Sequence, residues 1–402
     1  MPTDAVIVRA LRTPVGKYGG VLREIRPDDL SAAVIGSLVR SIGLDASSID
    51  DVFWGCANQA GEDNRNVGRM ATLLAGLPYS VPAATVNRLC GSSLEALIQA
   101  ARAIRSGDVH TVIAGGVESM SRAPYAVAKN AASAYGNLTA YDTALGWRFP
   151  NAKMAERFPL ESMGETAENV AAHYRIAREE QDLFALESHR KAVRAQQLGL
   201  FVPEMVPIDV PQKGGAVRHV DADEGPRADT TLEKLAALRP VFRANGTVTA
   251  GNSSTLNDGA SGVLLMSAER ARESGLRPVA RVVSAAVAGV DPRMMGIGPV
   301  PATQKALRAA GLAIDQIGLV ELNEAFAAQS IAVMRDLGIA SERVNQAGGA
   351  IALGHPLGCS GTRILTTLLN LMVRSGVKYG LATMCIGVGQ GIAVIVENCS
   401  SV

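Results

Sequence analysis

The sequence contains an internal repeat, and this repeat limits the possible folds more than any other feature. The segment CGSSLEALIQAARAIRSGDVHTVIAGG, which starts at Cys90, aligns without gaps with CSGTRILTTLLNLMVRSGVKYGLATMC, which starts at Cys359. Each copy reads as a Gly/Ser-rich turn, an amphipathic helix that ends at RSG, and a buried β-strand. The period is far longer than that of a solenoid. We therefore expect a duplicated α/β unit with a pseudo-twofold axis that brings the two helix openings to one site.

Both ends of the chain fit such a unit, whereas the middle does not. Near the N-terminus, β-branched runs such as AVIVRA and DVFWG flank the helical pattern LSAAVIGSLVRSIG, which indicates α/β layering. Residues 121–245 contain most of the Tyr and His and the charge-rich stretch RIAREEQDLFALESHRKAVRAQQ. We interpret them as an insertion with its own helices. It is either a solvated cap or a cover for a substrate.

Charge and cysteine usage exclude several classes of protein. The 39 basic side chains balance the 38 acidic ones, so no electrostatic footprint predicts binding to nucleic acid or to an anionic membrane. No apolar run is long enough to span a membrane, and MPTDAVIVRA has no signal-peptide features, so we expect a cytoplasmic protein. The five cysteines form no C-x-x-C pair, which favours free thiols over disulfides or a metal site. The expected partners are small molecules or other subunits.

Cys90 is a candidate nucleophile. It stands at a predicted helix start, where free backbone N–H groups and the helix dipole favour the thiolate and would lower the pKa of the thiol. A free cysteine is also often a small buried hydrophobe, so the position alone leaves both interpretations open.

His355 is the candidate base for such a nucleophile. It lies in NQAGGAIALGHPLGCSGTR, where the many glycines allow a ligand to approach the backbone closely, whereas the other four histidines lie in ordinary structural contexts. The loop could also be a tight turn or a phosphate cradle, but neither G-x-x-x-x-G-K-[ST] nor G-x-G-x-x-G occurs in it. A second thiol, Cys385, ends a buried strand in ATMCIGVGQG.

Several blocks together resemble the thiolase family of acetyl-CoA acyltransferases over essentially the whole chain. They are NRLCGSS, GGAIALGHPLG, CIGVGQG, NEAFA and GTVTAGNSSTLNDGA. The segments GCANQAGEDNRNVGRM and LGWRF further resemble the bacterial branch that includes 3-oxoadipyl-CoA thiolases. The resemblance implies an α/β fold with a five-layered α-β-α-β-α core of two duplicated halves. The N-terminal half would comprise residues 1–120 and 246–272, the inserted loop domain residues 121–245, and the C-terminal half residues 273–402.

The resemblance also implies catalytic roles. Cys90 attacks the thioester, and His355 takes its proton. Cys385 acts as general base on the α-carbon of acetyl-CoA, while His355 and a water held by Asn323 stabilise the enolate. The backbone N–H groups of Cys90 and Gly387 form the other oxyanion hole. On its residue type alone, Asn323 could equally be a helix N-cap.

For coenzyme A, the resemblance implies contacts from Arg227 near the adenosine end and from Ser254 and Phe326 along the pantetheine. Coenzyme A and acyl-CoA are then substrates, with no tightly bound cofactor and no metal. The protein is expected to be a homo-oligomer, a dimer or a tetramer.

Three departures from the family pattern stand near these residues. Ala347 replaces an asparagine in the N-x-N-G-G block, so we expect a polar contact of the family to be missing or moved here. Ser162 begins Ser-Met-Gly where some biosynthetic acetoacetyl-CoA thiolases have His-Met-Gly. Cys359 aligns with Cys90, and its helix opening would favour a thiolate, but we expect it to be a bystander. Glu324 and Gly354 are expected to support the site.

The resulting function is acyl transfer between a 3-ketoacyl-CoA or acetyl-CoA and coenzyme A through a Cys90 acyl-enzyme. The first expectation is an acetyl-CoA C-acetyltransferase or acyltransferase of fatty acid metabolism, and the alternative is a 3-oxoadipyl-CoA thiolase of aromatic degradation. A ketoacyl synthase would be expected to use two histidines. A non-catalytic acyl-CoA carrier would be expected to lack the catalytic thiols, so the presence of both Cys90 and Cys385 argues against it. A Cys/His hydrolase is disfavoured because it would not need a second thiol.

Overall fold

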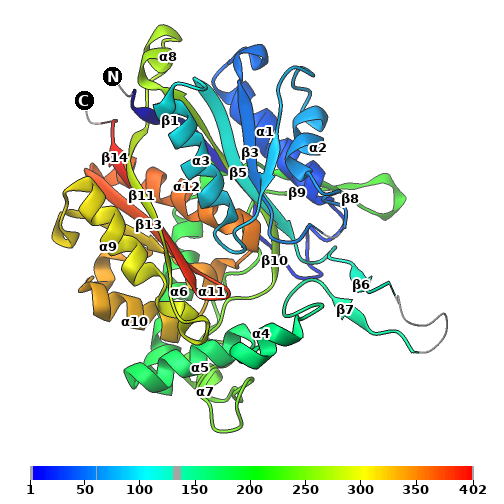
Figure 1. The fold of residues 1–402 in the computed structure, drawn as a ribbon, viewed down its shortest axis with the longest axis vertical. Coiled ribbons are helices and arrows are strands. Elements are labelled where there is room, and N and C mark those ends of the chain that lie inside the picture. The colour runs from blue at the N-terminus through cyan, green and yellow to red at the C-terminus, as the bar shows by residue number, and fades with distance from the viewer. Residues whose placement is uncertain (1–2, 60, 130–136, 401–402) are drawn as a thin grey trace.

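The computed structural model describes residues 3–59, 61–129 and 137–400. A mixed ten-stranded sheet runs through it (Figure 1). The strands of its N-terminal part lie in the order β4 (Ala84–Val86), β3 (Asp51–Gly55), β5 (Thr111–Ser119), β10 (Asn257–Ser267) and β1 (Ala5–Arg12). β3 is parallel to β4 and β5, whereas β10 is antiparallel to β5, to β1 and to the short β2 (Gly16–Lys17). Every residue of β5 and β10 is buried, as expected for strands that are covered on both faces.

The C-terminal part of the sheet repeats this arrangement. Its strands lie in the order β12 (Leu319–Leu322), β13 (Tyr379–Ile386), β14 (Gln390–Asn398) and β11 (Ala280–Gly289). β12 is parallel to β13, and β14 is antiparallel to β13 and β11, so the order and directions match β3, β5, β10 and β1. The equivalent strands β1 and β11 pair antiparallel at Val6–Arg281 and Ile7–Ala280 and join the two parts. The predicted duplication is therefore present in the fold.

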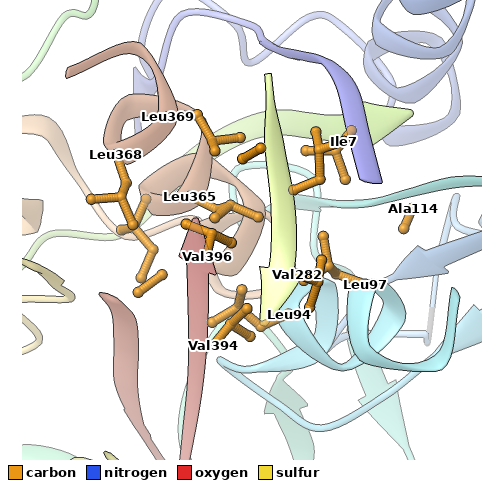
Figure 2. Close-up of a cluster of buried hydrophobic side chains, with 14 of the residues drawn as sticks. Ile7, Leu94, Leu97, Ala114, Val282, Leu365, Leu368, Leu369, Val394 and Val396 are labelled. Atoms are coloured by element: carbon orange, nitrogen blue, oxygen red, sulfur yellow. The ribbon is translucent and has the colours of Figure 1, made fainter. Parts of the chain in front are cut away.

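Two helices fill the space between the two parts of the sheet. α3 (Ser92–Ser106) and α12 (Leu357–Ser375) pack on each other and on strands of both parts. Figure 2 shows Leu94 and Leu97 of α3 and Leu365 of α12 in one cluster with Val282 and Val394 of the C-terminal strands. On the outer faces, α1 (Pro27–Ser41) and α2 (Val67–Leu74) cover the N-terminal part. α9 (Pro299–Ala310) and α10 (Ala327–Leu337) cover the C-terminal part. The five predicted layers are thus confirmed.

The ends of the two central helices follow the repeat, whereas their starts do not. Gly107 and Gly376, the glycines of the two RSG segments, cap the helices with φ of 84° and 69°, a left-handed conformation that favours glycine. α3 begins two residues after Cys90, but α12 begins two residues before Cys359. The two aligned thiols therefore occupy different positions relative to their helices.

The segment between β5 and β10 has its own elements. They are β6 (Tyr125–Val127), β7 (Ala140–Asp142), α4 (Ala152–Arg157), α5 (Met163–Tyr174), α6 (Arg178–Gln197), β8 (Ile208–Pro211), β9 (Val217–Val220) and α7 (Leu232–Ala236). α5 and α6 pack against α10 of the C-terminal part. α8 (Ala268–Glu273) and α11 (Ala350–Leu353) complete the helices named here. The division into an inserted loop domain at 121–245 and two halves remains our proposal, and its residues 130–136 lie outside the described part of the chain. Within the described ranges, no helix is both long and apolar enough to cross a membrane.

Candidate active site

Cys90 lies in the tight turn between β4 and α3. Leu89 before it has φ of 48°, a conformation that non-glycine residues rarely adopt, so the turn is strained. A Cβ added to Gly91 would come within 2.6 Å of Cδ1 of Ile386, which shows how closely the turn approaches the end of β13. The backbone N–H of Gly387 and that of Cys90 itself point at the sulfur. The predicted pair of amides is therefore at the candidate nucleophile.

The pKa of Cys90 differs from the expected direction. Burial raises it to about 11, and the amides of Gly387 and Cys90 offset only part of this effect. The prediction of a lowered pKa was wrong, because removal from water outweighs the local amides. A base must therefore take the proton for the thiolate to form at neutral pH.

His355 lies between α11 and α12, where neighbouring residues fix its backbone. Its N–H donates to Oδ1 of Asn257 at 2.9 Å. Gly354 has φ of 108°, and a Cβ there would lie 2.4 Å from Cγ of Asn257, so only glycine fits this position. Asn257 lies at the start of β10, in the predicted GTVTAGNSSTLNDGA block, although its role was not predicted from the sequence.

The hydrogen bonds of His355 assign its tautomer. The hydroxyl of Ser360 donates to the carbonyl of Pro356 at 2.9 Å, and Nδ1 of His355 lies 2.6 Å from the same hydroxyl oxygen. Because that hydroxyl has one hydrogen, Nδ1 must donate, which leaves Nε2 as the acceptor. Burial, together with the positive charge of Arg363, lowers the pKa of His355 to about 3, so the ring is neutral. The imidazole is thus ready to accept a proton at Nε2.

Asn323 follows β12 and lies beside this ring. Its Nδ2 is 3.4 Å from Nε2 of His355, and its buried Oδ1 has no protein hydrogen-bond partner among the described residues. α10 begins at Ala327 with Phe326 as the N-cap residue, so the N-cap interpretation of Asn323 was wrong. An unpartnered amide oxygen next to the base fits the predicted binding of a water.

Cys385 stands at the buried end of β13. It packs with Phe326, Met163 and Met295 in one apolar cluster. Burial raises the pKa of its thiol well above the usual range, and the charge of Cys90 raises it further, which means that the two thiols are near each other. The structure therefore brings Cys90, Gly387 and Cys385 together, as it does His355 and Asn323.

Two of the three predicted coenzyme A residues lie together. The N–H of Ser254 donates to the carbonyl of Ala325 at 2.9 Å, and the ring of Phe326 packs edge-on against Phe242 of the insertion, with centroids 6.4 Å apart. This face adjoins Cys385 through Phe326.

Arg227, the third predicted coenzyme A residue, lies on another loop. It is exposed, and its N–H donates to Nδ1 of His189 at 3.2 Å. A Cβ on Gly225 would come within 2.2 Å of the carbonyl oxygen of Ala352, so this loop packs against α11, just before His355.

Glu118 is a site residue that sequence reasoning missed. It ends the run VIAGGVE on β5, and its carboxylate accepts backbone N–H groups from Gly358 at 2.9 Å, Ala57 at 3.0 Å and Asn58 at 3.2 Å. Burial raises its pKa to about 7. An acidic residue at the end of an otherwise apolar strand is the signal that could have pointed to it. Glu118 ties the start of α12 to the loop after β3.

Two of the three family departures, Ala347 and Cys359, lie in buried surroundings that the structure describes. Ala347 is fully buried, while Asn345 supplies the polar contacts, since its Nδ2 donates to the carbonyl of Leu322 and to Oε1 of Glu324, both at 2.8 Å. Glu324 also accepts from Ser188 and so supports the loop. Cys359 lies 3.3 Å from Oγ of Ser261, and burial raises its pKa to about 12. The expectation that its helix opening favours a thiolate was wrong. Nowhere in the described ranges do three His, Cys, Asp or Glu side chains form a potential metal site.

Comparison with protein families identifies the class of this chain. The models of the thiolase N-terminal domain and the thiolase C-terminal domain match residues 5–269 and 276–398. The chain therefore belongs to the thiolase family and is an acyltransferase, as predicted.

Individual relatives are similar over nearly the whole chain. A β-ketoadipyl-CoA thiolase of Acinetobacter baylyi is 53% identical over 397 residues, which cover 98% of this chain and 99% of the relative. A 3-oxoadipyl-CoA/3-oxo-5,6-dehydrosuberyl-CoA thiolase of Escherichia coli is 54% identical over 398 residues, with the same coverage. The crystal structure of an acetyl-CoA acetyltransferase from Bacillus anthracis matches with a TM-score of 0.94, 41% identity and 99% coverage of both chains. The predicted family, branch and fold class are confirmed.

Proposed function

We propose that the protein cleaves 3-oxoadipyl-CoA with coenzyme A to give succinyl-CoA and acetyl-CoA. The main support for the proposal is the 53% and 54% sequence identity, over nearly the full length, to relatives named β-ketoadipyl-CoA thiolase and 3-oxoadipyl-CoA/3-oxo-5,6-dehydrosuberyl-CoA thiolase. The alternative stated from the sequence thus has more support than the acetyl-CoA C-acetyltransferase expectation.

In the first half-reaction, Sγ of Cys90 attacks the C3 carbonyl of the substrate, and Nε2 of His355 takes the thiol proton. The C2–C3 bond breaks, the thiol of Cys385 protonates C2, and acetyl-CoA leaves a succinyl thioester on Cys90. The amides of Cys90 and Gly387 stabilise the oxyanion on C3, because they already point at the reacting sulfur. His355 and a water on Asn323 stabilise the enolate of acetyl-CoA.

In the second half-reaction, the thiol of a new coenzyme A attacks the succinyl thioester. The thiol proton of coenzyme A goes to the thiolate of Cys385. As succinyl-CoA forms, the protonated His355 returns its proton to the departing sulfur of Cys90. Cys90, His355 and Cys385 thus regain their starting states. Splitting the transfer through a covalent intermediate replaces one difficult step by two easier ones.

The other expectations also enter as proposals. Coenzyme A binds along Ser254 and Phe326 and reaches Arg227, no cofactor is tightly bound, and the protein acts as a cytoplasmic homo-oligomer, a dimer or a tetramer. The full-length similarity to thiolases and the near-zero net charge support this part of the proposal.

A substrate panel tests the function. The purified protein is assayed with free coenzyme A and 3-oxoadipyl-CoA, 3-oxohexanoyl-CoA or acetoacetyl-CoA, and mass spectrometry measures the product thioesters. We expect kcat/KM for 3-oxoadipyl-CoA to exceed the other two by at least about tenfold, the scale of one good polar contact. A preference for acetoacetyl-CoA would instead support the acetyltransferase.

A further inference from the structure

Arg148 forms no direct ion pair with an acidic side chain of the described residues. It is half-buried in the loop between β7 and α4, within the sequence LGWRF (Figure 1). Its guanidinium donates to the carbonyl of Thr143 at 3.0 Å and to Oδ1 of Asn58 at 3.3 Å, which are both neutral acceptors. Across residues 3–59, 61–129 and 137–400, no carboxylate oxygen lies within ion-pair distance of it.

Three other arginines differ from Arg148 in having acidic partners. They form ion pairs: Arg88 with Glu95, Arg122 with Glu62, and Arg293 with Glu161. A partly desolvated cation without a counter-ion is costly, and a carboxylate is the group that a guanidinium binds best. Asp63 is close enough to feel the charge of Arg148, yet no hydrogen bond joins the two side chains: Oδ1 of Asp63 accepts the N–H of Gly61, and its buried Oδ2 has no protein hydrogen-bond partner among the described residues.

The loop that contains Arg148 is fastened next to the acyl end of the site. Nε1 of Trp147 donates to the carbonyl of Glu161 at 3.1 Å, two residues before Met163. Sδ of Met163 and Cδ1 of Leu89 would lie 3.3 and 3.5 Å from a Cβ on Gly387, whose amide points at the sulfur of Cys90. Leu89 and Met163 therefore both lie next to Gly387, at the amide that points at the reacting sulfur.

The Arg148 loop is also held by Asn58, whose neighbours connect it to the turn that contains Cys90. Asn58, which holds the guanidinium, donates its own N–H to Glu118 and uses Nδ2 to bind Thr143, so both acceptors of Arg148 are fixed. The carbonyl of the preceding Ala57 accepts from Asn87, three residues before Cys90. The guanidinium is thus held in one orientation, with donors left over for a ligand.

We propose that Arg148 binds the distal carboxylate of the substrate and so makes the enzyme select acyl chains that end in a carboxylate. This inference rests on the proposed function, because it requires a dicarboxylic acyl group such as the succinyl chain on Cys90. Arg148 is then a specificity-determining residue for the same site.

The test compares Arg148→Gln with the wild type and with Arg157→Met, which removes an exposed cation from α4 of the same insertion. The substrates are 3-oxoadipyl-CoA and 3-oxohexanoyl-CoA, which have the same chain length and differ in the terminal carboxylate. In Arg148→Gln, kcat/KM for 3-oxoadipyl-CoA should fall roughly tenfold to a hundredfold, the scale of a charged hydrogen bond. The value for 3-oxohexanoyl-CoA should stay within about threefold, as should both values in Arg157→Met.

Each outcome decides between the two proposals. If the wild type prefers 3-oxoadipyl-CoA and Arg148→Gln keeps the same ratio, the role of Arg148 is refuted and the proposed function stands. If the wild type does not prefer 3-oxoadipyl-CoA, the proposed function is refuted, and the inference about Arg148 is refuted with it. Equal loss on both substrates would assign Arg148 a structural role and overturn the inference. If Arg148→Gln does not fold, Arg148→Lys, which keeps the charge, provides the same comparison. Its ratio of kcat/KM for 3-oxoadipyl-CoA to kcat/KM for 3-oxohexanoyl-CoA should lie between the wild-type ratio and the ratio expected for Arg148→Gln.

Discussion

At the site, Cys90 and His355, which exchange a proton in the proposed mechanism, both rest in their neutral forms. The pKa of Cys90 is raised to about 11 and that of His355 is lowered to about 3, in each case mainly by burial. The resting enzyme therefore stores no thiolate. In the proposed mechanism, the ion pair forms only when substrate is bound, and a thiol that rests protonated is less susceptible to oxidation between turnovers.

The raised pKa of Cys90 predicts how the free enzyme reacts with iodoacetamide. Well below the pKa, the thiolate fraction grows about tenfold per pH unit, so the labelling rate at Cys90 should still rise between pH 8 and pH 9. Peptide mass spectrometry measures the rate at Cys90, and Cys90→Ser is the control. A plateau already below pH 8 would contradict the assignment.

The two site thiols should fail in different ways when they are changed. Cys90→Ser should lose acyl-enzyme formation and at least about a thousandfold in turnover. Cys385→Ala should still acquire an acetyl group from acetyl-CoA on Cys90, but should lose exchange of the α-protons with solvent by at least about a hundredfold.

The control for both variants is Cys359→Ala, which removes a buried thiol that faces Ser261. It should keep near-normal turnover. Intact-mass and peptide analysis report the label. Equal loss of labelling in Cys385→Ala and Cys90→Ser would refute the division of roles.

At the scale of elements, the start of α12 is fixed from outside the helix. Gly358 in its first turn donates to Glu118, a residue of the other half of the sheet, and Ser360 in the same turn positions the ring of His355. The loop that contains His355 is thus anchored on β5, a strand of the other part of the sheet.

Glu118→Gln tests this anchor. A carboxylate can accept all three N–H groups, whereas the amide nitrogen of glutamine meets at least one of them as a second donor. We expect unfolding free energy to fall by about 1–3 kcal/mol and kcat to fall at least about tenfold, with KM nearly unchanged. Urea denaturation and steady-state kinetics measure these quantities.

The matched control is Asp50→Asn, because Asp50 also accepts two backbone N–H groups, from His110 and Thr111, at the end of β5 opposite to Glu118. If its kcat falls as far as that of Glu118→Gln, Glu118 has no special link to the His355 loop.

The sequence predicted helix ends better than helix starts and site chemistry. A glycine at Gly107 or Gly376 is readable because the left-handed conformation nearly requires it. The Gly/Ser-rich turns predicted both helix starts to within two residues. The offset between the starts of α3 and α12 depends on the strained Leu89 and on Glu118 from a distant strand, so no local pattern reveals it. For the same reason the sequence predicted the residues Cys90 and His355 but not the direction of the Cys90 pKa, since burial is set by the whole fold.

At the scale of the whole molecule, buried neutral histidines make stability depend on pH. The pKa of His189 is lowered from 6.5 to about 4, mainly by burial and then by Arg227. Below pH 6.5 the unfolded chain therefore binds a proton that the native protein does not. The stabilising contribution is present above pH 6.5 and is lost as the pH falls towards 4, by up to about 1.4 kcal/mol per pH unit. His355 acts in the same direction.

His189→Asn isolates this effect, because its Oδ1 can still accept the N–H of Arg227. Between pH 6.5 and pH 4.5 the variant should lose less unfolding free energy than the wild type, as measured by urea denaturation at each pH. Parallel curves for the two proteins would show that His189 does not titrate in this way.

The pairing of β1 with its equivalent β11 has a consequence for how such a site can arise. Two separate but identical copies of this unit, assembled through that seam, would present the same residues at both helix openings. A lone copy could not place a cysteine on one side and a histidine on the other. Fusion into one chain lets each opening carry its own residues, so that one opening has Cys90 while the other has His355 and Cys359. The two helix openings can therefore carry different residues because the two copies are joined in one chain, and not because of the fold of either copy.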